Sequence, residues 1–158
     1  MKLYVGFFSI DYWVYKIIDF FSKAKRKDHV AIIIEDDTGA WCTYMGKRFK
    51  ARFSTIEVAK KCITPVETIY IGEIDCSYAD VEELLNKYAE KFWLWRIVLW
   101  FFITRWFSNW KPAGGCAVIV SKMLIELGYD IDIVVKPKDL FKELKDGNYI
   151  VGRKGGGW

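Results

Sequence analysis

Histidine and cysteine are scarce in this sequence, and their scarcity limits the chemistry that it can support. The chain has one histidine, His29, and four cysteines, which lie at positions 42, 62, 76 and 116. The cysteines are far apart and no two of them form a Cys-x-x-Cys pair, so a zinc site has too few well-spaced ligands. We therefore expect no metal and no other cofactor, and we expect thiols in place of disulfides.

Several other signals are also missing. The sequence has no internal repeat, no glycine-rich phosphate loop and no paired-carboxylate motif. Its N-terminal apolar run is short and lacks a small-residue cleavage site, so we expect no secretory signal and a cytoplasmic or membrane-associated protein. The formal net charge of +4 comes from basic residues spread along the chain, and this pattern does not indicate a nucleic-acid partner.

Apolar residues, in contrast, are abundant. Hydrophobic residues make up 53% of the 158 residues and aromatic residues 18%, which is too apolar for a disordered chain. A chain of this length can bury a core as a single domain without disulfides or metals. We expect one domain over residues 1–152 and a flexible C-terminal tail over residues 153–158.

Hydrophobic periodicity and turn residues predict a mixture of strands and helices. A strand is expected where apolar residues alternate or β-branched residues cluster, and a helix where apolar residues recur at intervals of three and four. The expected strands are 2–8, 28–34, 40–45, 66–74 and 148–151, and the expected helices are 10–22, a short one near 54–57, one from about 80 to 92, one from about 116 to 127, and 136–144.

Residues 110–128 contain the first candidate for chemistry. Apolar residues at helical spacing follow the pair Gly114 and Gly115, and Gly128 stands where a C-terminal cap belongs. Cys116 would then lie in the first turn of a helix, where unpaired amides and the helix dipole favour thiolate over thiol. Two interpretations stay open from this segment alone: a nucleophilic cysteine, or a small buried hydrophobic residue on a core helix.

His29 supplies the second candidate. It lies at the entrance of a β-branched strand, and a lone histidine on a strand is usually structural. A nucleophilic thiol, however, needs a general base, and His29 is the only imidazole in the chain. We therefore expect His29 and Cys116 to lie within hydrogen-bond reach of each other.

At this point the chain resembles a known family, the permuted papain-fold cysteine hydrolases of the NlpC-like superfamily, in which the histidine precedes the cysteine. The resemblance begins with an N-terminal strand and helix. It covers most of the chain, and the matching segments follow one another in the same order as in that family. The segments that carry it are 27–34, 40–45, 114–128 and 136–144.

The resemblance implies an α+β fold in which a papain-like half-barrel of antiparallel strands packs on a helix that bears the nucleophile. Cys116 would be the nucleophile, and His29 the general base and later acid. In such folds a polar group on the neighbouring strand orients the imidazole, and hairpin geometry makes Thr43 the first candidate, ahead of Tyr44 and Cys42.

Residues 92–110 are the densest aromatic stretch in the chain. Arg96 and Arg105 interrupt it and would be costly near the centre of a bilayer, so a transmembrane helix is not expected. Three roles stay open: the lid or wall of an apolar pocket, plain core, or contact with a membrane surface. In the first role, four tryptophans would cover the cleft beside the thiol and bind the apolar part of a substrate: Trp93, Trp100, Trp106 and Trp110.

The sequence thus predicts a thiol hydrolase or acyltransferase that acts on an amide, ester or thioester bond through an acyl-enzyme. The family implies peptidoglycan-type amidases and peptidases or lipid-directed acyltransferases, and hence a peptide, a lipid or a small acyl compound as substrate. The alternative is a catalytically inactive binding or membrane-surface module that keeps the same fold.

Overall fold

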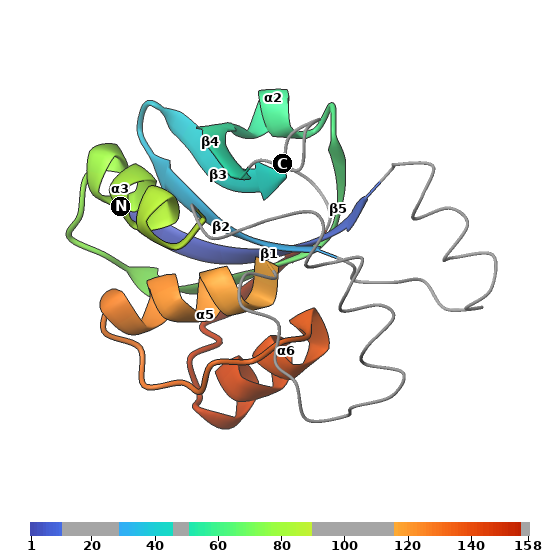
Figure 1. The fold of residues 1–158 in the computed structure, drawn as a ribbon, viewed down its shortest axis with the longest axis vertical. Coiled ribbons are helices and arrows are strands. Elements are labelled where there is room, and N and C mark those ends of the chain that lie inside the picture. Colours follow the sequence, from blue (N-terminus) through green and yellow to red (C-terminus); the bar gives the residue numbers. More distant parts are fainter. Residues whose placement is uncertain (11–28, 46–50, 90–115, 156–158) are drawn as a thin grey trace, which may run out of the picture.

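The protein has a mixed α+β fold built on one open antiparallel sheet. The computed structural model describes residues 1–10, 29–45, 51–89 and 116–155. Within these residues, six strands follow one another across the sheet in the order β4-β3-β2-β1-β5-β6. Figure 1 shows α5 and α6 on one side of this sheet and α2 on the other. The expected α+β class and its antiparallel strands are confirmed.

The elements have the following bounds. The strands are β1 (Lys2–Ile10), β2 (His29–Asp36), β3 (Gly39–Met45), β4 (Ala51–Thr55), β5 (Ile63–Glu73) and β6 (Gly152–Gly155). The helices of the described residues are α2 (Ile56–Ala59), α3 (Tyr78–Ala89), α5 (Cys116–Glu126) and α6 (Pro137–Asp146). Within the same residues, no helix is both long enough and apolar enough to cross a bilayer.

Most of the sequence-based elements are confirmed, and two differ. β4 was not expected, because its residues 51–55 are a short and partly basic segment without clear alternation. The last strand pairs with β5 at Gly152–Gly155 and not at 148–151, so residues 153–155 belong to the sheet and not to a loose tail. Nearly all of the expected helix 10–22 lies outside the described residues.

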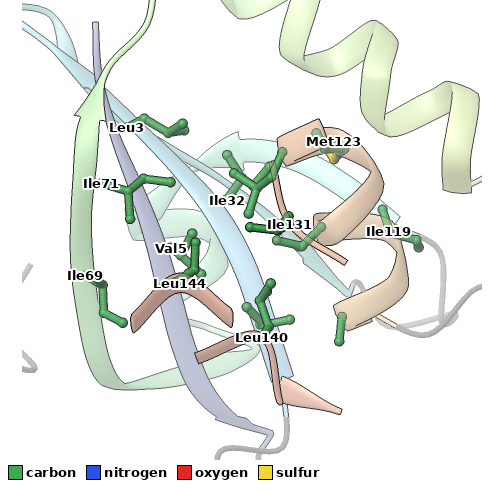
Figure 2. Close-up of a cluster of buried hydrophobic side chains, with 14 of the residues drawn as sticks. Leu3, Val5, Ile32, Ile69, Ile71, Ile119, Met123, Ile131, Leu140 and Leu144 are labelled. Carbon is green, nitrogen blue, oxygen red and sulfur yellow. The ribbon is translucent and has the colours of Figure 1, made fainter. Parts of the chain in front are cut away.

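Alternation along the strands divides the core into two clusters, one on each face of the sheet. On the helix face, Val5 and Ile32 pack with residues of α3, α5 and α6, as Figure 2 shows for part of this cluster. On the opposite face, Tyr4, Phe8 and Ile33 pack with residues of α2. Because side chains alternate along a strand, consecutive residues of β2 belong to different clusters.

The β2–β3 hairpin is closed by the turn chemistry that the sequence predicts. The Asp36 carboxylate accepts hydrogen bonds from the Thr38 backbone N–H at 2.7 Å, the Thr38 hydroxyl at 2.6 Å and the Gly39 N–H at 3.2 Å. These bonds, together with one from Tyr78, lower the pKa of Asp36 to about 2, because they stabilise the ionised form. The turn therefore fixes the register in which β3 follows β2.

Helix α5 ends in the way that its sequence predicts. Gly128 takes a φ of 93°, a left-handed conformation that glycine adopts without the penalty of a Cβ. The Tyr129 N–H donates to the Leu124 carbonyl at 3.0 Å and the Gly128 N–H to the Ile125 carbonyl at 3.0 Å, which satisfies carbonyls at the helix end. This cap holds the C-terminal end of the helix that begins at Cys116.

A second left-handed glycine produces a bulge in β5. Leu3 of β1 pairs with Gly72 and Tyr4 pairs with Tyr70, so Ile71 is the extra residue, and Gly72 has a φ of 138°. The Tyr129 hydroxyl donates to the Ile71 carbonyl at 3.2 Å, which satisfies a group that the bulge takes out of the ladder.

We expect Gly72→Ala to lower the free energy of unfolding by about 1–2 kcal/mol, because alanine is strained at this φ. Its added Cβ would also lie 3.4 Å from the Tyr129 hydroxyl oxygen. Gly152→Ala is the matched control, since its Cβ would meet only the Tyr70 Cβ at 3.9 Å. Urea unfolding should separate the two variants, and equal losses would show that the bulge does not require glycine.

Candidate active site

The candidate site lies where β2 and β3 part. Among the described residues, the ladder between these strands ends at the pair Ile33 and Cys42. The next amide along β2, that of Ile32, donates instead to the Thr43 hydroxyl oxygen at 3.0 Å. β3 meanwhile pairs with β4 as far as Met45 and Ala51. β2 and β3 therefore diverge toward the N-terminal end of β2, where His29 lies.

A small pocket occupies this divergence. Its volume is about 20 Å³, which is room for about one water molecule. Because it lies at the gap between two strands, residues from both faces of the sheet can reach it. Residues of β2, β3, β4, α3 and α5 line it: His29, Val30, Thr43, Tyr44, Ala51, Leu85, Cys116, Ile119 and Val120.

Cys116 is the first residue of α5 and lines this pocket, as the sequence predicts. It is half-buried against the helix-face cluster, and its sulfur is not part of a disulfide. The first amides of a helix lack partners within the helix and carry the positive end of its dipole. Such a position generally favours the nucleophilic form of a cysteine, and Cys116 is the only described cysteine that begins a helix.

His29 lines the same pocket, but its ring packs on the face of the sheet that carries Phe8 and α2, opposite α5 and α6. It pairs with Phe8 across β1 and β2, and the two ring centroids are 6.5 Å apart. The side chain is 4% exposed, and burial lowers its pKa from 6.5 to about 4, so the imidazole is neutral near pH 7. A neutral imidazole is the form that accepts a proton.

The hydrogen bonds of His29 differ from those we expected. Among the described residues, neither ring nitrogen has a hydrogen-bond partner. The structure therefore brings His29 and Cys116 to one pocket without joining them by a hydrogen bond. A buried polar group without a partner is uncommon and costly, and such groups are found where a protein binds or reacts with something.

Thr43 also lies at the pocket, on the helix face. Its hydroxyl oxygen accepts the Ile32 amide, so the hydroxyl supports the gap between the strands and is not bonded to His29. The other two candidates for orienting the imidazole, Cys42 and Tyr44, belong to the cluster on the opposite face. Burial raises the pKa of Cys42 to about 12, so this cysteine stays a thiol.

The expected substrate-binding residues are four tryptophans of the aromatic segment. The tryptophans of the aromatic segment lie outside the described residues: Trp93, Trp100, Trp106 and Trp110. In the described part of the chain, no group of three metal-ligating side chains comes together. Ala51 and Leu85 line the pocket but were not expected there, since apolar residues on an unexpected strand and on a surface helix carry no chemical signal.

Comparisons with known proteins identified no relative. No protein-family model matches the chain, and neither a curated protein nor a solved structure matches it significantly. The resemblance to permuted papain-fold cysteine hydrolases therefore rests on the sequence segments that suggested it. The site has to be judged on its own geometry.

The neutral, buried His29 should make the protein less stable in acid. The unfolded chain takes up a proton at its ordinary pKa of 6.5, whereas the folded protein resists protonation down to about 4. Stability should therefore fall as the pH drops through this window, by about 2 kcal/mol between pH 7 and pH 5. Urea unfolding at several pH values measures this change.

His29→Leu is the control, because leucine fills the same apolar surroundings without a proton to gain. The variant should lose much less stability than the wild type over the same pH range. An identical pH dependence in both proteins would mean that the imidazole is protonated as easily in the folded state as in the unfolded state.

Proposed function

We propose that the protein is a thiol hydrolase or acyltransferase with Cys116 as nucleophile and His29 as general base. The observation that carries the proposal is the shared pocket: the one imidazole of the chain and a cysteine at a helix N-terminus both line it. The imidazole has no hydrogen-bond partner among the described residues. Burial lowers its pKa to about 4, so in this proposal it takes the thiol proton only after it leaves its buried position.

In this proposal the chain is a permuted papain-like domain, and the reaction runs in two stages. His29 takes the thiol proton, and the Cys116 sulfur attacks the carbonyl carbon of an amide, ester or thioester, which forms a C–S bond. The imidazolium then returns the proton to the leaving amine, alcohol or thiol as its bond to carbon breaks. In the second stage His29 takes a proton from water, or from an acceptor alcohol or amine, whose oxygen or nitrogen attacks the thioester carbon. The C–S bond then breaks, the acyl group leaves on the attacking atom, and the imidazolium returns the proton to the Cys116 sulfur.

The first stage requires the imidazole to turn from Phe8 toward the pocket. His29 is the first residue of β2 and lies beyond the last pair of the β2–β3 ladder, so among the described residues no backbone pairing with β3 holds it in place. Catalytic hydrogen bonds are often long or misaligned before a substrate binds. The backbone N–H of Cys116 would meet the developing oxyanion.

The residues around the pocket favour an apolar acyl group over a polar one. Apart from His29, Thr43, Tyr44 and Cys116, every residue that lines it is aliphatic. Because the pocket has room for only about one water molecule, the proposal requires it to widen when the acyl group binds. In the proposal, the tryptophans of residues 92–110 extend this apolar surface, and Arg96 and Arg105 meet a polar or anionic group at its rim.

A second candidate function is a binding module that keeps this fold without catalysis. Two observations favour it: the imidazole packs beside Phe8 on the opposite face, and the Thr43 oxygen is engaged by the Ile32 amide. In that case Cys116 is a half-buried hydrophobic residue of the core, and its thiol reacts no faster than an ordinary one.

Thiol alkylation separates the two functions. If the dyad forms, iodoacetamide should modify one thiol rapidly at pH 6.5, and Cys116→Ser should abolish this rapid phase. His29→Gln should slow it by at least about tenfold, because the thiolate loses its proton acceptor. Intact mass against time measures each rate.

Cys62→Ser and Cys76→Ser are the matched controls, because both residues are half-buried thiols like Cys116. Each should leave the rapid phase unchanged. The proposal fails if the wild type shows no rapid phase, or if the rapid phase survives in Cys116→Ser.

A further inference from the structure

A second concave site lies on the face of the sheet opposite α5 and α6, at the other end of β1 from Phe8 and His29. It is a groove with a volume of about 440 Å³, which is within the range of small-molecule sites. Residues from four adjacent strands line it: Lys2, Tyr4, Glu35, Tyr70, Gly152, Arg153 and Lys154. None of them belongs to the candidate active site.

Strand register explains why these side chains meet. Lys2 pairs with Glu35 across β1 and β2, and Tyr4 pairs with Tyr70 across β1 and β5. Because paired residues point to the same face, these four side chains share the face that carries Tyr4. Arg153 differs: its guanidinium lies over the Phe141 ring of α6, so it contributes to the groove from the other side of β6.

The floor of the groove is aromatic. The Tyr4 and Tyr70 ring centroids are 5.2 Å apart, with 47° between the ring planes, and Tyr70 is half-buried. Gly152, the residue that pairs with Tyr70 on β6, has no side chain, so this flank of the ring is not covered from that position. A flat ring can stack there, as nucleic-acid bases stack on aromatic side chains in single-stranded nucleic-acid sites.

The charged groups of the groove lie above this floor. The Tyr4 hydroxyl donates to one Glu35 oxygen at 2.6 Å, and the Lys154 ammonium lies 4.0 Å from the other. Lys154 comes from β6 and Glu35 from β2, so this ion pair spans two intervening strands, β1 and β5. This ion pair is long and partly exposed, and such pairs contribute little to stability. A more highly charged anion can therefore replace Glu35 as the partner of the Lys154 ammonium.

Ammonium groups, aromatic rings and a carboxylate meet in this groove, and together they favour one kind of ligand. The ammonium groups of Lys2 and Lys154 suit a phosphate, and the tyrosines suit a flat ring. The Glu35 carboxylate would repel any anion placed directly against it, so the phosphate has to meet the two ammonium groups on their outer side. The carboxylate itself can accept hydrogen bonds from ribose hydroxyls or from a base amino group. We propose that the groove binds a nucleoside monophosphate, with the base beside Tyr70 and the phosphate between Lys2 and Lys154.

Isothermal titration of the whole protein with AMP tests the proposal, with adenosine and inorganic phosphate as separate probes. AMP should bind, and each fragment alone should bind at least about tenfold more weakly, since each forms only part of the contacts. The double variant Lys2→Gln/Lys154→Gln should weaken AMP binding by at least about tenfold, because a charged hydrogen bond is lost. Cys116→Ser should bind AMP like the wild type.

Two further variants make the test specific. Gly152→Val should fill the groove beside Tyr70 and weaken AMP binding without disturbing β6, because a Cβ there makes only an ordinary contact. Lys138→Gln/Lys142→Gln removes the same charge from α6, on the other side of the sheet, and should leave binding unchanged.

Any of three results would overturn the proposal. If inorganic phosphate binds as tightly as AMP, the lysines bind the phosphate and the groove makes no contact with the adenine ring that strengthens binding. AMP binding that is absent, or that Gly152→Val leaves unchanged, would show that the groove is not the site.

Discussion

The candidate active site depends on the point at which the ladder between β2 and β3 ends. Beyond Ile33 and Cys42 the Ile32 amide donates to the Thr43 hydroxyl, so this buried amide keeps a partner where the strands diverge. That divergence creates the pocket in which the start of β2 meets the start of α5. Thr43 was expected to orient the His29 imidazole. In the structure its hydroxyl instead accepts the Ile32 amide and so supports the gap between the strands.

The sequence predicted the elements more reliably than the contacts between them. Strand β2, its turn and helix α5 follow from local patterns: a β-branched run, an Asp-Asp-Thr-Gly turn, and apolar spacing closed by Gly128. Local patterns also placed Cys116 at a helix N-terminus. The face on which His29 points is a different matter, because it depends on register with β1, which no local pattern specifies.

The two faces of the sheet have different chemistry, and the division comes from strand alternation. The helix face buries aliphatic residues from most elements and brings α5 to the sheet. The opposite face carries Tyr4, Tyr70 and Glu35 at one end of β1 and the Phe8–His29 pair at the other. One sheet can therefore support a thiol site at the gap between β2 and β3 and a separate polar groove several residues away along the same strands.

The central claim is that the Cys116 sulfur accepts an acyl group with the help of His29. Peptide mass spectrometry after a brief reaction with p-nitrophenyl acetate and an acid quench tests this most directly. The account predicts an acetyl group on the peptide that contains Cys116, and far less of it in His29→Gln. Acetylation of lysines or of Cys62 alone, or equal acetylation of Cys116 in both proteins, would contradict it.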